Sequence, residues 1–447
     1  MSFDTVLIAN RGEIALRVIE ACRELGLRSV CVYSEADAEM PYLRLADESV
    51  CIGPPEPARS YLNIAAIVSA AELAGAGGIH PGYGFLAENP HFVEVCEEHG
   101  LTFIGPPKPV TELLGNKLVA RETVAEAGVP VLPGEPAPGD PSGLLEAGER
   151  IGYPLLIKAV FGGGGRGMRR VATSDELAEK VAAASEEAKA ASGDGALYLE
   201  KALADPRHIE VQIIADGDEN LVHLGERECS IQRRHQKLIE ESPAPSLSED
   251  VRGQLRQAAL WAARAVGYRN AGTVEFLLAP DGAFYFIEMN ARIQVEHAVS
   301  EVVCGVNLIK EQILLAAGER LSFTQQEAEP RGHAIECRLN AEDPKRDFLP
   351  SCGKITIDQL PGGYGVRLDT ALYNGMDVLP YYDSLIAKLV TWGQDRESAR
   401  LRMITALERF ELSGIETTRD LVAEILTRTE FKTGEYTTAF LERLLAG

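Results

Sequence analysis

The sequence lacks the features that mark several classes of protein. Its eight cysteines are scattered, with no Cys-x-x-Cys pair and no metal-ligand spacing. Such cysteines are typical of reduced, buried thiols, so neither a disulfide scaffold nor a zinc module is indicated. No apolar run approaches the ~20 residues that span a bilayer, and the opening MSFDTVLIAN has no basic segment before an apolar one. We therefore expect a cytoplasmic protein with no signal peptide and no membrane span.

Positive charge is also scarce in this sequence. Lys and Arg number 44 against 67 Asp and Glu, which gives a formal net charge of −23. An acidic surface of that size repels polyphosphate, so nucleic acid is not an expected partner. Any anionic substrate must instead be held by a local cluster of cations.

The first apolar pattern in the chain is a strand, a helix and a second strand. Residues 5–10 form a short apolar run, residues 12–25 carry an apolar stripe at helical spacing, and residues 28–34 form the next strand. Such a βαβ unit favours parallel pairing. Asn10 and Glu13 have the spacing of a capping box at the start of the helix.

The remaining pattern predicts an α/β and α+β protein of three domains. Further strands at ESVCIG, GGIHPG and LTFIGP complete an α/β domain over residues 1–114. A second domain is expected over 115–320, and it contains a small α/β unit at about 131–203 that could move as a lid. The Pro- and Gly-rich stretch 128–143 is interpreted as its hinge or linker. A β-rich domain with terminal helices follows at 331–440.

A run of glycines at residues 162–167 indicates a loop that approaches a phosphate closely. A Walker loop is excluded, because Met168 and Arg169 stand where Lys and Ser or Thr are required. A dinucleotide fingerprint is disfavoured, because the next segment is extended and a helix begins only at about Ser174. A flexible linker is the plain alternative. Apolar strands on both sides favour a hairpin tip over a phosphate, with Lys158 at its base.

A second hairpin brings two carboxylates together. The β-rich runs TVEFLL and AFYFIEMN flank Asp281–Gly282, a strong signal for a two-residue turn. A turn centred there places Glu275 directly opposite Glu288. Facing carboxylates repel each other, and a divalent cation removes that repulsion. Oxygen ligands, with Asn290 on the same face, suit Mg²⁺ or Mn²⁺.

The same polar face continues beyond the hairpin if the chain stays extended. Glu288, Asn290, Arg292, Gln294 and Glu296 would then share it. A solvated surface is the plain alternative, but five consecutive polar positions beside a metal favour a site. Arg292 can bind a small anion with its fork, and Glu296 can act as a base.

More cations lie in the stretch ERECSIQRRHQK at residues 226–237. His235 and Lys237 are candidate contacts for an anion or a phosphate, with a charged surface strand as the alternative. His208, taken alone, is more typical of a structural histidine. Cys229 has no His and Asp arrangement around it and is interpreted as a packing residue or a residue at the rim of the site.

Seven motifs together resemble the biotin carboxylase family, the ATP-grasp component of acetyl-CoA carboxylase and related biotin-dependent carboxylases. They are IANRGEIALR, IHPGYGFLAEN, GGGGRGMR, SIQRRHQK, FYFIEMNARIQVEH, GHAIECRLNAEDP and YYDSLIAKL, in family order along essentially the whole chain. The resemblance implies a Rossmann-like pre-ATP-grasp domain, an ATP-grasp domain with a mobile lid and a C-terminal biotin carboxylase domain. It implies that ATP, bicarbonate and biotin yield ADP, phosphate and carboxybiotin.

The resemblance also implies a set of site residues. ATP would be contacted by Lys117, Lys158, Gly164, Gly165, His208, His235, Glu275 and Glu288, with Glu200, Lys201 and Leu203 at the adenine. Two Mg²⁺ or Mn²⁺ ions would be held by Glu275, Glu288 and Asn290. Bicarbonate would bind Lys237, Arg292, Gln294 and Val295. Glu296 would be the base, Arg338 would stabilise the enolate-like form of biotin, and Tyr83 would lie near biotin.

The sequence departs from the family pattern at a few positions. Val160 and Phe161 precede the glycines where small residues are usual, which is closer to pyruvate-carboxylase-like and some acyl-CoA-carboxylase forms. Ala291 and Ala298 replace Thr and Pro near the base, and neither position supplies a ligand. No Met-Lys-Met biotinylation motif occurs, so we expect a separate biotin carboxyl carrier protein. No region of carboxyltransferase length remains in the sequence, so separate carboxyltransferase subunits are expected as well. The family resemblance implies a homodimer of this chain.

Other functions compete with this interpretation. A different ATP-grasp ligase, which joins an acyl phosphate to an amine, would share the phosphate loop and the metal site. A catalytically silent ATP-binding scaffold would not require Glu296 and Arg338. The final acyl acceptor, whether acetyl-CoA, propionyl-CoA or pyruvate, is selected on the carboxyltransferase and so has no signature here.

Overall fold

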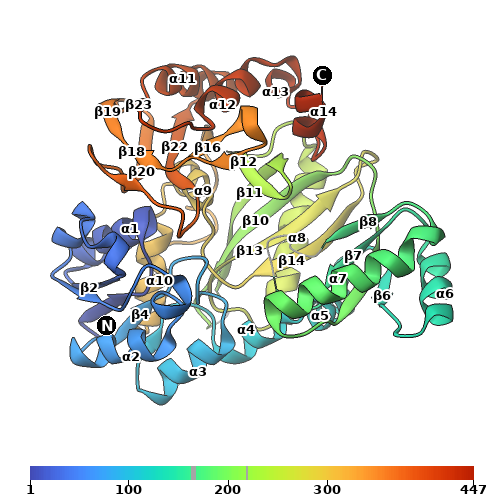
Figure 1. Cartoon of the computed structure of the whole chain (residues 1–447), viewed down its shortest axis with the longest axis horizontal. Coiled ribbons are helices and arrows are strands. Elements are labelled where there is room, and N and C mark those ends of the chain that lie inside the picture. The colour runs from blue at the N-terminus through green and yellow to red at the C-terminus, as the bar shows by residue number, and fades with distance from the viewer. Residues whose placement is uncertain (163–167, 218–219, 447) are drawn as a thin grey trace.

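The computed structural model describes residues 1–162, 168–217 and 220–446. Figure 1 shows the N-terminal strands and helices on one side, a small sheet with two helices on the opposite side, and the C-terminal helices over the top. A large sheet runs between these parts. None of the helices in the described ranges is long and apolar enough to cross a membrane.

The N-terminal part is a parallel five-stranded sheet in the order β3-β2-β1-β4-β5, as the βαβ pattern predicts. Its strands are β1 (Thr5–Ile8), β2 (Arg28–Tyr33), β3 (Glu48–Cys51), β4 (Gly78–His80) and β5 (Thr102–Phe103). Its helices are α1 (Gly12–Leu25), α2 (Ile64–Leu73), α3 (Pro90–Glu98) and α4 (Lys108–Gly115), and α5 (Lys117–Glu126) follows. The predicted stripe of α1 is buried at Ile14, Val18 and Cys22.

The predicted capping box of α1 is wrong. The side chain of Asn10 instead donates to the carbonyl oxygens of Pro81 and Tyr83, both at 2.7 Å. The carboxylate of Glu13 accepts from the Tyr83 hydroxyl. Both side chains therefore join the start of α1 to the loop after β4, which brings that loop to the site described below.

The small unit is an antiparallel sheet in the order β6-β9-β7-β8 with two helices. Its elements are β6 (Gly134–Pro136), α6 (Pro141–Ile151), β7 (Leu155–Ala159), β8 (Arg169–Val171), α7 (Leu177–Ser192) and β9 (Leu197–Lys201). The expected strands on either side of the glycine run are β7 and β8, which pair with each other. The stretch 128–143 is not only a linker, because β6 within it pairs with β9.

The large sheet has eight strands in the order β14-β13-β10-β11-β12-β15-β22-β20. They are β10 (Arg207–Ala215), β11 (Leu221–Arg233), β12 (Gln236–Ser242), β13 (Asn270–Leu278), β14 (Phe284–Asn290), β15 (His333–Asn340), β20 (Val366–Thr370) and β22 (Leu385–Gly393). The C-terminal strands β15, β20 and β22 belong to this sheet, since β15 pairs with β12 and β22 pairs with both β15 and β20. This pairing places the C-terminal strand β15 next to the strand that carries Lys237.

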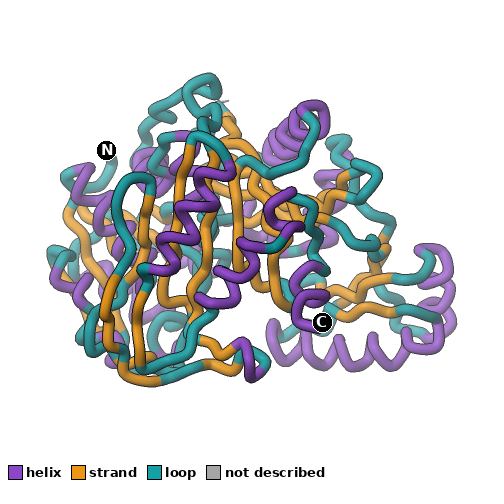
Figure 2. Tube along the Cα trace, turned by 90° about the horizontal axis from the view of Figure 1, so that it is seen from above, coloured by secondary structure: helices purple, strands orange, loops and turns teal. Residues whose placement is uncertain are grey.

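Helices cover both faces of the large sheet, because alternating residues of its strands point to opposite faces. One face packs on α5, on α8 (Glu249–Ala265) and, further along, on α11 (Arg396–Glu408) and α12 (Arg419–Thr427). On the other face, α9 (His297–Cys304) lies over Ala334 and Val390, and α10 (Leu308–Ala316) packs against α1. The view from above in Figure 2 shows the small unit projecting from one end of this layered body.

Short elements complete the C-terminal part. Three two-stranded pairs join β16 (Glu342–Asp343) to β17 (Leu349–Pro350), β18 (Gly353–Lys354) to β21 (Asp377–Val378), and β19 (Thr356–Gln359) to β23 (Glu411–Ser413). The chain ends in α13 (Thr429–Thr433) and α14 (Phe440–Ala446). The expected β-rich region with terminal helices is confirmed.

Candidate active site

A cavity of about 1060 Å³ lies where all the parts of the molecule meet. Its wall is built from the large sheet, the small sheet, the loops after β1 and β4, and the segment before β22. The predicted residues that line it are Tyr83, Lys117, Lys158, Leu203, His208, His235, Lys237, Glu275, Glu288, Asn290, Arg292, Gln294, Val295, Glu296 and Arg338. This acidic chain thus gathers cations in one place, as an anionic substrate requires.

Two predicted residues do not bring their side chains to this cavity. Glu200 forms ion pairs with Lys158 and with Arg121, the latter at 2.8 Å. The amine of Lys201 donates to the carbonyl oxygens of Gly152 and Tyr153 at 3.0 and 2.9 Å. Glu200 therefore orients Lys158 from behind. Gly164 and Gly165 lie outside the described residues.

The carboxylate hairpin has the predicted pairing but a different turn. Glu275 lies opposite Glu288 in the register of β13 and β14. The two-residue turn is wrong, because the Ala279 amide donates to the Ala283 carbonyl and leaves three residues in the loop. A β-bulge next to Glu275 restores the register. The two carboxylates face each other because the longer loop and the bulge compensate.

Cations and amides surround these two carboxylates. Glu275 is 2.9 Å from His208 Nε2 and 3.4 Å from Lys237 Nζ, and it accepts from the amides of Asn290 and Gln294. Although burial disfavours its charge, Lys237 and His208 lower the pKa of Glu275 well below the usual range. Burial would lower the pKa of His208, but Glu275 raises it.

Glu288, on the partner strand of the hairpin, forms an ion pair with Lys117, whose Nζ lies 2.6 Å from Glu288 Oε2. Burial opposes the charge of this lysine, but the carboxylates of Glu288 and Glu275 raise its pKa. Each carboxylate of the pair thus has its own cation. Lys117 begins α5, so the entry into the second domain supplies this contact.

A second cluster surrounds Glu296. Its Oε1 accepts from Lys237 at 2.5 Å and its Oε2 from Arg338 at 2.9 Å. Burial opposes its charge, but Lys237 and Arg338 hold the pKa of Glu296 well below its usual value. Lys237 also contacts Glu210, and its own pKa lies well above normal because three carboxylates outweigh burial. Glu296 is therefore an ionised carboxylate, held between two cations.

The segment that carries Arg292, Gln294 and Glu296 is not extended. β14 ends at Asn290, and α9 begins at His297, so the predicted single polar face stops at Asn290. The irregular segment nevertheless turns all three side chains into the cavity. It buries Ile293 in the core against α1 and α10, and this anchor replaces the expected strand.

Arg292 donates to two side chains and to the Ile293 carbonyl in this arrangement. Its Nε donates to Glu88 at 2.9 Å and another nitrogen donates to Asn290 Oδ1 at 3.0 Å. Glu88 was not predicted from the sequence, since nothing in its spacing distinguishes it. Cys229 is fully buried, which confirms its interpretation as a packing residue.

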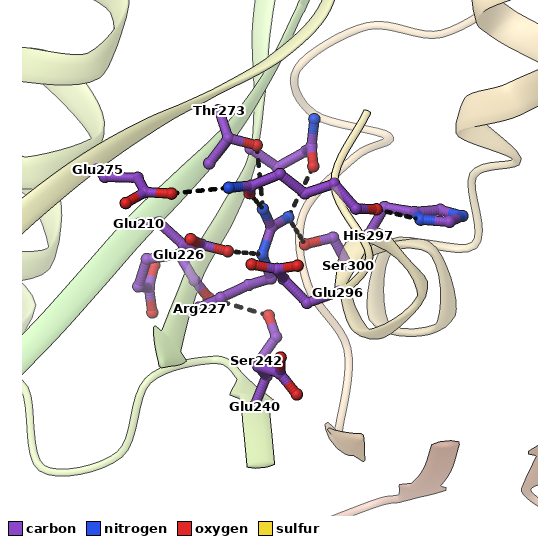
Figure 3. Close-up of polar contacts among 12 residues, drawn as sticks. Glu210, Glu226, Arg227, Glu240, Ser242, Thr273, Glu275, Glu296, His297 and Ser300 are labelled. Carbon is purple, nitrogen blue, oxygen red and sulfur yellow. Dashed lines mark hydrogen bonds and ion pairs between the residues drawn. The ribbon is translucent and has the colours of Figure 1, made fainter. Parts of the chain in front are cut away.

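Glu210 was missed although the sequence contained a signal for it, whereas Lys388 and Arg227 had none. Glu210 lies two positions after His208 on β10, so strand alternation places both on the face of the cavity. Its carboxylate binds both Arg227 and Lys237. Lys388 on β22 is fully buried and donates to the Val295 carbonyl at 3.0 Å. Figure 3 shows Arg227 between Glu210, Thr273 and Ser300, close to Glu296.

A small antiparallel sheet facing a larger one across a cavity of cations and paired carboxylates defines an ATP-grasp enzyme. The middle of the chain, residues 116–324, matches the family described as "Carbamoyl-phosphate synthase L chain, ATP binding domain". Residues 2–111 match "Biotin carboxylase, N-terminal domain" and residues 336–443 match "Biotin carboxylase C-terminal domain".

The chain belongs to the biotin carboxylase family, whose members are ATP-dependent ligases. It is 51% identical to the biotin carboxylase of Nostoc sp. over 99% of this chain and the whole of that protein. It is also 51% identical to one of the pyruvate carboxylase subunits of Methanothermobacter thermautotrophicus, over all of this chain and 91% of that protein.

Solved structures agree with this assignment. The biotin carboxylase–β,γ-ATP complex from Campylobacter jejuni superposes with a TM-score of 0.96 at 48% identity, over 99% of each chain. The biotin carboxylase domain dimer of the Hydrogenobacter thermophilus 2-oxoglutarate carboxylase, with MgADP and bicarbonate, gives a TM-score of 0.96 at 47% identity, over 99% of this chain and 98% of that one.

Proposed function

We propose that this chain carboxylates biotin on a separate carrier protein in the cytoplasm, with ATP and bicarbonate as co-substrates. The observation that carries the proposal is the cluster of Glu296, Lys237 and Arg338 directly beside the carboxylate pair, in one cavity. A base, an anion-binding lysine and a second cation at one point are what the activation of bicarbonate requires.

ATP would occupy the part of the cavity next to the small sheet. Apolar side chains there can take an adenine: Leu156, Tyr198, Leu203, Leu277 and Ile287. The phosphates would lie toward Lys117, Lys158, His208 and His235. Closure of the small sheet over this end, with the glycine loop including Gly164 and Gly165 above the phosphates, would exclude water.

Glu275, Glu288 and Asn290 would hold two Mg²⁺ or Mn²⁺ ions. The residues fit such ions, because they offer oxygen ligands from facing positions on β13 and β14. When bound, the metal supplies positive charge that offsets the charge developing on the phosphates. The structure of the Hydrogenobacter relative with MgADP supports magnesium. Lys117 and His208, which hold the two carboxylates here, would turn toward the phosphates when ATP and metal are bound.

Bicarbonate would bind beside Glu296, between Lys237, Arg292, Gln294 and the backbone of Val295. Glu296 takes the proton of bicarbonate, and the resulting oxyanion attacks the γ-phosphorus of ATP. The bond from phosphorus to the ADP oxygen breaks, which gives ADP and carboxyphosphate. Carboxyphosphate hydrolyses readily, so a closed cavity protects it.

Biotin would enter on the side of Tyr83 and Arg338. The bond between the carboxyl carbon and the phosphate oxygen of carboxyphosphate breaks. The released phosphate takes the proton of the ureido nitrogen, and this nitrogen forms a bond to the carboxyl carbon. Arg338 would stabilise the enolate-like oxygen of biotin in that step. Its guanidinium is already shared by Glu240 and Glu296 at 2.5 and 2.9 Å, which sets its position.

The carrier and the carboxyltransferase belong to the parent complex. We place the chain in an acetyl-CoA carboxylase, with a pyruvate, propionyl-CoA or other acyl-CoA carboxylase as the alternative. The Nostoc biotin carboxylase and the Methanothermobacter pyruvate carboxylase component match at the same 51% identity, so neither parent is favoured by similarity. A homodimer is supported by the dimer of the Hydrogenobacter relative.

The test is ADP release by the purified chain with Mg²⁺, ATP and bicarbonate, with and without free biotin. The proposal requires stimulation by biotin that disappears without bicarbonate. Glu296→Ala should keep ATP binding and lose biotin-dependent turnover. Turnover indifferent to biotin would instead indicate another ATP-grasp ligase, and no turnover a scaffold. Addition of candidate carboxyltransferases with each acyl acceptor then identifies the parent complex.

A further inference from the structure

Arg227 lies behind the wall of the cavity, in the middle of β11, and its side chain is completely buried. All five of its N–H groups donate a hydrogen bond. The acceptors are Glu210 Oε1 at 2.5 Å, Gln212 Oε1 at 2.6 Å, Ser300 Oγ at 3.0 Å, Thr273 Oγ1 at 3.0 Å and Gln294 Oε1 at 2.6 Å. Figure 3 shows this guanidinium surrounded by its partners. Because the guanidinium group of Arg227 is planar and all of its donors are paired, its orientation is fixed.

The bond to Gln294 decides how that side chain faces the cavity. Because Arg227 occupies the amide oxygen, the amide nitrogen of Gln294 must point the other way, where it donates to Glu275 Oε1 at 2.7 Å. The orientation of the amide is therefore enforced from behind. A free glutamine would lose this preference and could present either atom to an anion.

The bond to Glu210 reaches a second residue of the cavity. One oxygen of this fully buried carboxylate accepts from Arg227, and the other accepts from Lys237 at 2.6 Å. Lys237 in turn contacts Glu296. A shift of the guanidinium thus moves Glu210, and with it the ammonium group.

We propose that Arg227 is the positioning residue of the bicarbonate end of the site, acting through Gln294 and Glu210 without touching substrate. The inference rests on the proposed function, because it assigns to Gln294 and Lys237 the binding of bicarbonate. It predicts that the main defect falls on bicarbonate, since two of the acceptors are Gln294, which is itself proposed to bind bicarbonate, and Glu210, which holds Lys237.

Arg227→Lys is the first test variant. It keeps the charge opposite Glu210 but cannot reproduce the fork to Gln294. We expect the bicarbonate KM to rise about 10- to 100-fold, as for the loss of a hydrogen bond to a charged group. The KM for ATP should stay within about twofold of wild type, which is the error of additive comparisons.

Two matched controls remove a bond from the same guanidinium elsewhere. Thr273→Val and Ser300→Ala each free one N–H of Arg227 but leave its bonds to Gln294 and Glu210. If Arg227 serves only the fold, these variants and Arg227→Lys will lose thermal stability and activity in parallel. The proposal requires that both controls retain the bicarbonate KM.

A double-mutant cycle tests whether Arg227 acts through Gln294. Gln294→Ala should raise the bicarbonate KM by itself, and Arg227→Lys on that background should add little. Fully additive effects in the cycle, or an unchanged bicarbonate KM in Arg227→Lys, would overturn the proposal. If the wild-type protein shows no bicarbonate-dependent turnover that biotin stimulates, the proposed function itself is refuted, and this is measured before any variant is compared.

A charge-balanced pair covers the case in which Arg227→Lys does not fold. Arg227→Met with Glu210→Gln removes both members of the buried ion pair, a change that buried pairs often tolerate. The double variant should have a higher bicarbonate KM than Glu210→Gln alone, because it also loses the bond from Arg227 to Gln294. An equal KM in the two variants would also overturn the proposal.

Discussion

Lys388 offers a sharp test of how the three parts of the chain are held together. Its ammonium group is completely buried on β22. It lies 3.1 Å from Glu13 Oε1 on α1 and 3.6 Å from Asp369 Oδ2 on β20, and it donates to the Val295 carbonyl. Burial opposes its charge, but Glu13 and Asp369 raise the pKa of Lys388. The ammonium group of Lys388 thus links α1, β20 and the segment that carries Glu296.

The cost of removing this charge depends on which carboxylate is left alone. Asp369 retains Arg367, whose guanidinium lies 2.7 Å away. Glu13 has no other cation within 4.0 Å among the described residues. Lys388→Met should therefore leave Glu13 as an uncompensated buried charge and cost about 3–5 kcal/mol, as for other broken buried pairs.

Two second-site variants separate this explanation from a general packing defect. Glu13→Gln in the Lys388→Met background removes the uncompensated charge and should restore most of the stability. Asp369→Asn in the same background should restore none, because Asp369 is already neutralised by Arg367. Both second-site substitutions replace a carboxylate with its amide. A difference in stability between the two double variants therefore reports on the charge of Glu13.

Hydrogen exchange of peptides from β22 and the start of α1 measures these effects locally. A loss of about 3 kcal/mol corresponds to roughly 100-fold faster exchange through local opening. Exchange in Lys388→Met at the wild-type rate would refute the reasoning. Equal rescue by both second-site variants would show that the charge of Glu13 is not the cause.

Three shorter predictions follow from other contacts. Glu288→Gln removes a charge beside Lys117 and a proposed metal ligand, so calorimetry should show about 10- to 100-fold weaker MgATP binding, with a smaller change for the metal-free nucleotide. Tyr83→Phe removes the hydroxyl that binds Glu13, and the KM for biotin should rise about 2- to 10-fold while that for ATP is unchanged. Glu241 is buried, which opposes its charge, but hydrogen bonds from His333 and Arg396 lower its pKa from 4.5 to about 2. A lowered pKa stabilises the fold above pH 4.5, and the effect is lost as the pH falls toward 2. Glu241→Gln should therefore lose about 3 kcal/mol at pH 7 and progressively less below pH 4.5, measured by urea unfolding.

Local patterns predicted most of the elements because those elements follow local rules. The parallel strands and the helix at 12–25 come from apolar periods that tertiary packing reinforces. β6 was missed because Gly134 and Pro136 are poor strand formers, and only its pairing with β9 makes it a strand. The addition of β15 to β12 could not be predicted, since nothing local encodes a pairing between distant segments.

The site divides in the same way between local and distant determinants. Glu275 and Glu288 could be placed opposite each other because a single hairpin contains both. Arg292, Gln294 and Glu296 were identified for a reason that proved partly wrong, since the segment is irregular and is positioned by the buried Ile293. The residues behind the cavity had no such signal, because a buried arginine or lysine is recognised only by its partners in space.

These hidden residues also explain how an acidic chain can keep so many cations in one cavity. Glu210, Glu240 and Glu13 are buried carboxylates outside the set proposed to touch substrate, and each holds a cation. Glu210 binds Lys237, and Glu240 binds Arg338, so the two cations nearest Glu296 are held in place before any substrate arrives. A preorganised cluster of this kind needs little rearrangement when negative charge develops on bicarbonate and phosphate. The excess of acidic residues is thus compatible with an anion site, because part of it orients the cations that the site requires.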